Sequence, residues 1–215
     1  MTRAYSVCWA GILKLVKTEI LVDKGQFSSS EDWFRIRDDI EVAIRSMEWP
    51  PGAGKFILYD EKGKGRGKGN GVKPIKEMFA QLLFERGRWA TETKMLIPAR
   101  AKPGKIDLST NVGDRVFGIE WETGNISSSH RAMNKLAMGL LNGFLIGGFL
   151  ITPTRRMYTY LTDRVGNFEE LSPYFPIWKS IPINEGMLGV IAVEHDDVSK
   201  RVPKFHKGTN GRALA

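Results

Sequence analysis

The chain has 215 residues, enough for one domain with a sizeable core, and we treat residues 1–215 as a single domain. Lysine and arginine outnumber aspartate and glutamate by 32 to 24, and this net charge of +8 favours a polyanionic partner, with nucleic acid ahead of a membrane surface. The single cysteine, Cys8, excludes an internal disulfide framework and a cysteine-based metal site, and it fits a reducing compartment.

Two helices are expected near the N-terminus. Residues 5–16 carry apolar side chains at a spacing closer to helical than to strand periodicity. Further on, Ser28 as N-cap and Glu31 at the third helical position resemble a capping box. Apolar residues then recur at steps of three and four as far as Met47, and Pro50 stops the pattern. This second segment is predicted to be amphipathic.

Residues 56–59 suit a short edge strand, and residues 61–71 then alternate glycine with lysine and arginine. Because glycine supports no packed element, we expect a mobile, positively charged loop that could follow a phosphate backbone. A solvated surface loop is the commoner meaning of a basic tract, and both interpretations stay open. A nucleotide-binding P-loop is excluded, because no Gly-Lys-Ser or Gly-Lys-Thr closes the glycine segment.

Another helix and a hairpin follow. Pro74 suits a first helical position, apolar residues continue on one face, and Gly87 lies past the end. Residues 106–108 and 112–121 have strand character around a turn at Gly113.

The C-terminal half is expected to alternate helices and strands. Residues 128–141 have a helical period, and residues 144–152 form the apolar run typical of a strand covered on both faces. The longest apolar stretch, residues 139–151, is too short to cross a bilayer, so we expect a soluble, cytoplasmic protein. A short helix or turn is expected at residues 157–161, and a helix opened by Asn167 or Arg164 is expected at residues 167–175. Two final strands are expected at residues 181–183 and 188–193, followed by a basic, mobile tail at about residues 199–215.

Acidic residues converge at the predicted hairpin. Glu120 and Glu122 project to the same side of an extended strand, while Ile119 and Trp121 face the packed side. Pairing of the two strands would bring Asp107 beside both glutamates. Such carboxylates suit Mg²⁺, and metal-dependent nucleases hold the ion in this way beside the scissile phosphate. Glu-x-Glu also occurs in strands for solubility alone, so the spacing by itself leaves the two interpretations equal.

Polar residues come directly after these acids. Asn125, three serines, His130 and Arg131 read as a helix N-cap and a first turn whose side chains can hydrogen-bond base edges. Ser127 fits a plain N-cap as well. His130 is assigned no chemistry, because a helical histidine is more often structural or solvent-facing.

A longer string carries a family resemblance. Residues 118–135, GIEWETGNISSSHRAMNK, closely resemble the BamHI family of type II restriction endonucleases, within the PD-(D/E)XK nuclease superfamily. Shorter stretches resemble it in the same order along the chain, at residues 71–77, 160–165 and 167–171. The resemblance implies an α/β restriction-endonuclease-like fold, in which helices flank a central mixed β-sheet.

The same resemblance implies an active site. Asp107, Glu120 and Glu122 would be its acids with Glu92 as a fourth, and Asp107, Glu120 and Glu92 would hold Mg²⁺. Glu122 stands where most of the superfamily carries lysine, and its expected role is to handle the proton of the attacking water. Lys76 is an expected phosphate contact near the site.

The resemblance also implies base readout in the major groove by Asn125, Ser127, Arg131, Asp163 and Arg164. Arginine suits guanine, and aspartate suits the amino group of cytosine. Because all five are retained, GGATCC is the expected recognition sequence. Considered alone, the aspartate–arginine pair would more ordinarily be a surface ion pair.

Three departures from the family stand out. The loop between the two hairpin strands is shorter, and the family's extra C-terminal helix looks absent. Residues 207–211 resemble the family's minor-groove arm, but Asn210 replaces an acid there, which leaves a DNA contact by Asn210 open.

The resulting expectation is a type II restriction endonuclease of a restriction–modification system. A homodimer, in contact through residues 128–141 and 168–175, would cut both strands of a palindrome by Mg²⁺-dependent phosphodiester hydrolysis, leaving 5′-phosphate staggered ends. Two alternatives remain: a DNA-binding protein without cleavage, and a structure-specific repair nuclease with little sequence preference.

Overall fold

The structure is a computed structural model that describes residues 13–65, 67–96, 103–162 and 165–206. Its strands are β1 (Lys14–Lys24), β2 (Ile57–Tyr59), β3 (Ala90–Lys94), β4 (Lys105–Val112), β5 (Arg115–Trp121), β6 (Leu145–Pro153), β7 (Gly186–Glu194) and β8 (Asp197–Ser199). Its helices are α1 (Glu31–Arg45), α2 (Val72–Phe84), α3 (Ile126–Leu141), α4 (Arg155–Tyr158), α5 (Phe168–Leu171) and α6 (Phe175–Lys179), with 3₁₀ turns η1 (Phe27–Ser29) and η2 (Ser172–Tyr174).

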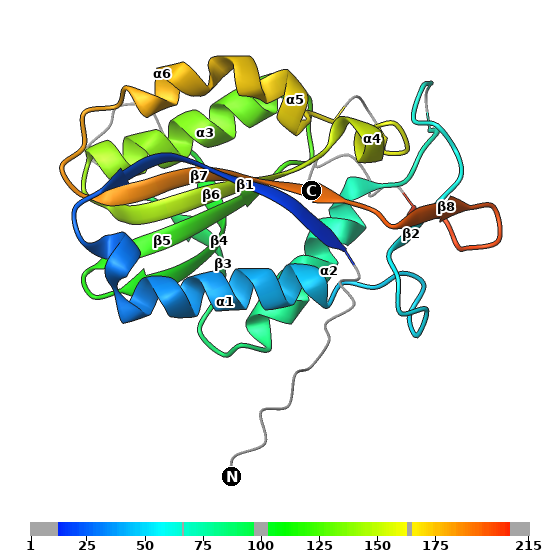
Figure 1. Ribbon diagram of the computed structural model, residues 1–215, viewed down its shortest axis with the longest axis horizontal. Coiled ribbons are helices and arrows are strands. Elements are labelled where there is room, and N and C mark those ends of the chain that lie inside the picture. Colours follow the sequence, from blue (N-terminus) through cyan, green and yellow to red (C-terminus); the bar gives the residue numbers. More distant parts are fainter. Residues whose placement is uncertain (1–12, 66, 97–102, 163–164, 207–215) are drawn as a thin grey trace, which may run out of the picture.

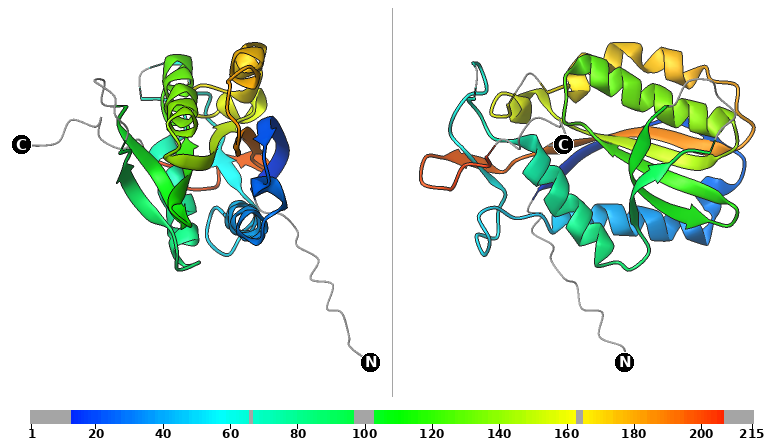
Figure 2. Two further views of the ribbon diagram at one scale, coloured as in Figure 1. Left: turned by 90° about the vertical axis from the view of Figure 1, so that its left-hand side faces the viewer. Right: turned by 180° about the vertical axis from the view of Figure 1, so that it is seen from behind.

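A six-stranded mixed sheet in the order β1-β7-β6-β5-β4-β3 forms the centre of the molecule. The strands β5, β6 and β7 are parallel, while β1, β4 and β3 pair antiparallel with their neighbours. Helices α1 and α2 cover one face of this sheet, and α3, α5 and α6 cover the other (Figures 1 and 2). A small parallel sheet of β2 and β8 projects from one end.

Apolar residues are packed on both faces of the central sheet. Every residue of β6 and of β7 is buried. One apolar cluster joins α1 and α2 to the sheet, and a second joins α3, α5 and α6 to its other face. The prediction of an α/β fold with a mixed sheet between helices is therefore confirmed.

The helix predicted over residues 5–16 is wrong for its described part. Residues 14–16 begin β1, which pairs antiparallel with β7, whereas residues 5–12 lie outside the described residues. The β-branched residues Val16, Thr18, Ile20 and Val22 alternate along β1, and such side chains suit a pleated surface. Pairing with β7 thus overrides the helical spacing read from a shorter window.

Three element boundaries also differ from the predictions. Helix α1 is capped by Ser30, whose Oγ accepts a hydrogen bond from Trp33 N at 3.1 Å, whereas Ser28 lies in the 3₁₀ turn η1. Pro74 is the third residue of α2, a first-turn position where its missing N–H has no partner to lose. Residues 181–183, predicted as a strand, lie outside the strands, and β7 begins at Gly186.

Most of the other predicted elements are confirmed. The helix predicted over residues 167–175 is instead divided into α5, η2 and the start of α6. In the tail predicted from about residue 199, Phe205 is buried, and residues 207–215 lie outside the described residues. Strands β4 and β5 form the hairpin, and Gly113 takes the left-handed conformation (φ +58°) that its turn requires. Residues 61–65 and 67–71 form a loop outside helices and strands. Among the described residues, no helix combines the length and the apolar character that crossing a bilayer requires.

A buried carboxylate ties α1 to the segment between α2 and β3. Asp39 is fully buried and accepts hydrogen bonds from Arg86 Nε, Arg88 Nε and Trp89 Nε1, at 2.7, 2.7 and 2.9 Å. Its neighbour Asp38 reaches only Arg86, 2.9 Å from Nη2, with its side chain 63% exposed.

We expect Asp39→Ala to lower the free energy of unfolding by about 3 kcal/mol, because three donors lose a buried charged acceptor. Asp38→Ala is the matched control and should cost less than about 1 kcal/mol, since exposed ion pairs contribute little. Urea denaturation of the two variants measures both values. Equal losses would show that burial of the Asp39 carboxylate does not govern this junction.

Candidate active site

The hairpin register brings the predicted acids together. Leu108 pairs with Ile119, so the preceding Asp107 lies opposite Glu120. Asp107 Oδ2 accepts a hydrogen bond from Trp121 N at 3.0 Å. A cavity of about 460 Å³ opens beside these strands, lined by Pro103, Gly104, Asp107, Glu120, Trp121, Glu122, Thr123, Gly124, Ser128, Arg131, Ala132 and Lys135. The structure thus places all three hairpin acids on one cavity, as the sequence predicted.

Glu120 is a buried carboxylate that is paired with a lysine. Lys135 Nζ, from α3, lies 2.7 Å from Glu120 Oε1 and forms an ion pair with it. Burial raises the pKa of Glu120 to about 7, with Lys135 opposing the shift and the charge of Asp107 adding to it. A buried carboxylate with this pKa is readily neutralised by a proton or by a cation near neutral pH.

Glu122 follows directly after β5 and is held by the start of α3. Its Oε1 accepts a hydrogen bond from Gly124 N at 2.6 Å, and its Oε2 accepts one from Ser129 Oγ. Burial raises the pKa of Glu122 to about 7, and these hydrogen bonds only partly offset it. A carboxyl that titrates near neutral pH can take up or release a proton under physiological conditions.

Two lysines balance the charge of the acids. Lys76 Nζ, from α2, donates to Asp107 Oδ1 at 2.7 Å, so the expected phosphate contact lies beside the acids. Lys135 Nζ also donates to the carbonyl of Lys105 at 2.6 Å. Lys135 was not predicted as a site residue, although Ser128, Arg131 and Lys135 follow one helical face at steps of three and four.

The donor chemistry fits a hard divalent cation, since carboxylate oxygens from Asp107, Glu120 and Glu122 share the cavity. In the conformation described, however, no three acidic, histidine or cysteine side chains of the described residues converge as metal ligands. The oxygens of Asp107 are engaged by Lys76 and Trp121, those of Glu122 by Gly124 and Ser129, and Oε1 of Glu120 by Lys135. The residues fit a metal in kind, and in this conformation protein groups engage their oxygens.

The fourth predicted acid, Glu92, is not brought to the cavity. Its side chain is exposed, 3.6 Å from Lys105 Nζ. The pairs Thr91–Leu108 and Thr93–Ile106 nevertheless place residue 92 opposite Asp107. Glu92 has a left-handed backbone (φ +54°), which is uncommon for a residue other than glycine. The strand is thus locally distorted directly across from the acids.

Polar residues lie at the start of α3, and two of them, Ser128 and Arg131, line the cavity. Asn125 caps the helix, its Oδ1 accepting from Ser128 N at 3.3 Å, and Arg131 Nη2 donates to Ser128 Oγ at 3.3 Å. Asn125, Ser127 and Arg131 are exposed on the first two turns. The structure therefore brings these three base-reading candidates together, whereas Asp163, Arg164 and Asn210 lie outside the described residues.

This fold is that of a restriction endonuclease. The crystal structure of restriction endonuclease BglII complexed with a DNA 16-mer superposes with a TM-score of 0.59 at 12% sequence identity, covering 89% of each chain. The sequence identifies a particular family within this fold, because residues 13–212 match the family model of restriction endonuclease BamHI.

Two curated relatives agree with that match. The type II restriction enzyme OkrAI of Oceanobacter kriegii is 43% identical over 202 residues, covering 94% of this chain and all of the relative. The type II restriction enzyme BamHI of Bacillus amyloliquefaciens is 33% identical over 204 residues, covering 91% and 92%. The chain therefore belongs to the BamHI restriction endonuclease family and is a type II restriction enzyme.

We expect Glu122→Gln to raise the free energy of unfolding at about pH 8, by on the order of 1–3 kcal/mol, and much less at about pH 5. The folded pKa lies above the ordinary value of 4.5, so the cost of ionising Glu122 is absent below that value and grows as pH rises toward 7 and beyond. The amide still accepts from Gly124 N and can donate to Ser129 Oγ.

Urea denaturation at the two pH values measures the effect of Glu122→Gln. Glu77→Gln, on the exposed surface of α2, is the control and should change stability by less than about 0.5 kcal/mol at either pH. A gain at Glu122 that did not depend on pH would contradict the assigned cost of charge burial.

Proposed function

We propose that the protein cuts both strands of palindromic duplex DNA, most specifically GGATCC, by Mg²⁺-dependent hydrolysis that leaves 5′-phosphate staggered ends. One observation carries the proposal: the acids Asp107, Glu120 and Glu122 line the same cavity as Arg131, on the helix that follows them directly. A groove-reading surface is thereby joined to a hydrolytic centre. The resemblance of residues 118–135 to the BamHI family supports the choice of sequence.

Asp107 and Glu120 are the proposed ligands of Mg²⁺. Asp107 and Glu120 lie opposite one another across the hairpin, and both line the cavity. Bound there, the ion would activate water and stabilise charge on the phosphate. Glu92 is the third proposed ligand, supported by its register opposite Asp107, and its exposed side chain would have to turn toward the cavity.

Glu122 and Lys76 have separate proposed roles. Glu122 accepts the proton of the attacking water, since its raised pKa lies near the working pH and Ser129 and Gly124 fix its orientation. Lys76 contacts the phosphate, because its ammonium lies beside Asp107 at the cavity.

Base readout is assigned to Asn125, Ser127, Arg131, Asp163 and Arg164. Arg131 suits the guanine edge, and Asn125 and Ser127 lie beside it on α3. Asp163 and Arg164 are carried by the family resemblance. Asn210 is proposed as a DNA contact on the same basis, at a position where an acid is expected.

We also infer a homodimer, as a palindrome requires two equivalent half-site readers. Large apolar side chains are exposed near the predicted contact: Leu141 at the end of α3, Tyr174 in η2 and Ile177 in α6, exposed by 49%, 42% and 62%. Association of two copies through this layer would bury them.

A plasmid with one GGATCC sequence should be linearised by the protein in Mg²⁺, and a plasmid with one altered base pair in that sequence should be cut at least about a hundredfold more slowly. Sequencing the ends locates the cut. Cleavage of both plasmids at equal rates would favour the repair-nuclease alternative. Binding without cleavage in Mg²⁺ would favour a DNA-binding protein.

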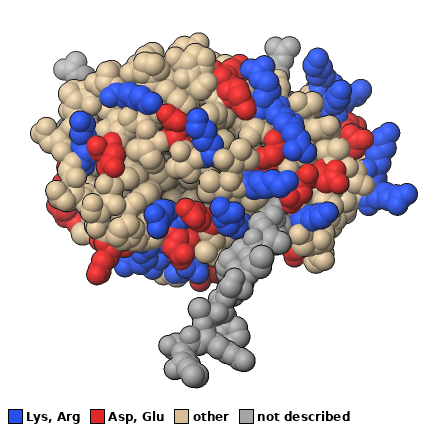
Figure 3. Space-filling model, in the orientation of Figure 1, with Lys and Arg blue, Asp and Glu red and all other residues tan. Residues whose placement is uncertain are grey.

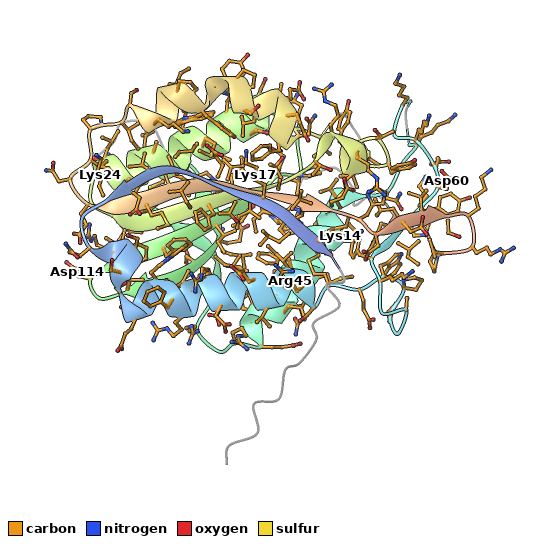
Figure 4. All side chains as sticks on the ribbon, viewed as in Figure 1. Lys14, Lys17, Lys24, Arg45, Asp60 and Asp114 are labelled. Atoms are coloured by element: carbon orange, nitrogen blue, oxygen red, sulfur yellow. The ribbon has the colours of Figure 1, made fainter. Side chains whose placement is uncertain are left out.

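Glu122→Lys should lose cleavage and keep binding to GGATCC duplex in a gel-shift assay, because it replaces the proton acceptor by a cation and leaves α3 intact. Asp114→Lys makes the same charge change at the exposed hairpin turn, at the far end of the molecule (Figure 4), and should cut normally. Normal cleavage by Glu122→Lys would refute the role given to Glu122.

The double substitution Tyr174→Asp with Ile177→Asp should shift the protein from dimer to monomer in light scattering at matched concentration, since charges at an apolar contact remain unpaired. Phe34→Asp, exposed by 48% on α1, is the control and should leave the mass unchanged. A monomeric wild-type protein, free and on DNA, would contradict the dimer.

A further inference from the structure

The basic loop, residues 61–71, has a buried base and an exposed tip. At the base, Gly63 N donates to Thr159 O at 2.9 Å, and Gly69 N donates to Glu61 Oε2 at 2.8 Å. A Cβ at Gly63 would lie 1.7 Å from Leu161 O, so the loop and residues 159–161 are in direct backbone contact. The tip is formed by residues 62, 64, 65, 67 and 68, which are exposed.

Asn70 fastens the base to three parts of the chain. Its fully buried side chain donates from Nδ2 to Tyr59 O at 2.9 Å and to Tyr160 O at 3.0 Å. Its Oδ1 accepts from Tyr59 N at 3.2 Å and from Phe205 N at 3.4 Å. Its backbone oxygen accepts from Thr162 N at 2.9 Å. The loop is thereby fixed to the residue that directly precedes Asp163 and Arg164.

The loop also leads directly into the helix that carries Lys76. Gly71 caps α2, and Lys76 of that helix reaches Asp107. The loop lies at the end of the molecule where β2 and β8 project, with Asp60 marking that end and Lys24 the opposite one (Figures 1 and 4). The base therefore connects the proposed base-reading segment and the proposed phosphate contact.

Charge at the tip is not neutralised by the protein. Lys62, Lys64 and Lys68 are exposed, and none forms an ion pair with a carboxylate of the described residues. The loop's Glu61 is occupied by Lys204, which also donates to Gly67 O at 3.3 Å. Lysine and arginine side chains project from this end of the surface (Figure 3). The tip therefore exposes the ammonium groups of Lys62, Lys64 and Lys68, and hydrogen bonds of Asn70 hold its base in place.

We infer that the tip of the basic loop binds the phosphate backbone of duplex DNA outside the recognised base pairs. The inference rests on the proposed function. Thr162, which the base of the loop holds, directly precedes residues 163–164 in the sequence. Because those two residues are assigned to base edges within the recognised sequence, the loop is assigned to the adjoining backbone. Glycine alternating with lysine lets the cations follow successive phosphates, and no base contact is needed.

The test compares two duplexes that carry the same GGATCC sequence, one of about 10 base pairs and one of about 24, in EDTA so that no metal-dependent cleavage occurs. In the variant, Lys62, Lys64 and Lys68 are all changed to alanine. Its affinity for the long duplex should fall about tenfold to a hundredfold at moderate salt, and the slope of log affinity against log salt should become shallower by about 2–3. Its affinity for the short duplex should change less than about threefold.

Two matched variants complete the experiment. Changing Lys24, Arg35 and Arg37 to alanine removes three exposed cations from β1 and α1 and should leave both affinities within about threefold of wild type. Changing the three tip lysines to arginine should retain binding to the long duplex. Equal weakening on both duplexes, or no weakening on either, would overturn the inference while the wild-type preference for GGATCC still supports the proposed function. A wild-type protein without that preference would overturn both.

Discussion

Burial of two glutamates at the end of β5 is the constraint on which the rest of the site depends. Carboxylates in a low-dielectric environment resist ionisation, and here burial raises the pKa values of Glu120 and Glu122 to about 7. Other elements must supply compensating groups, and they do: Lys135 and Ser129 come from α3, and Lys76 comes from α2. The fold accepts a loss of stability at this edge to keep reactive oxygens there.

The sheet topology explains why hydrolytic and reading residues lie so close together. Strands β5 and β6 are parallel, so the chain must cross over between them, and α3 is that crossover. The helix begins only four residues after Glu122, so its first turns rise directly beside the acids. A shift of α3 would change both the hydrogen bonds to Glu122 and the position of Arg131. Recognition and chemistry are mechanically coupled through one helix.

Local patterns in the sequence predicted much of this arrangement. The alternation around Glu120, the turn at Gly113 and the helical period of residues 128–141 are short-range features, and each has its expected structure. The two-sided burial of β6 also followed from its apolar run. The convergence of Asp107, Glu120 and Glu122 was predicted for the same reason, because the three lie on one hairpin or directly after it.

Features that depend on distant partners were missed or misassigned. Strand β1 is a strand because β7, more than 160 residues later, needs a neighbour at its edge. The buried amide of Asn70 is explained by Tyr160 and Phe205, and neither contact has a local signal. Lys135 was passed over because its partner Glu120 belongs to another element. Glu92 was assigned to the site from the family resemblance, but its exposed side chain does not reach the cavity in this structure.

The contact between Gly63 and the carbonyl of Leu161 has an evolutionary consequence. Any side chain at position 63 would push apart two segments that the rest of the domain holds in place. At Gly67, nearer the tip, an added Cβ would touch nothing, and only the left-handed backbone (φ +75°) favours glycine there. For the stability of the fold, substitution of the exposed lysines at the tip is therefore cheap, whereas substitution of Gly63 is costly. Related proteins can therefore differ in the length of this loop while keeping the fold that carries the acids.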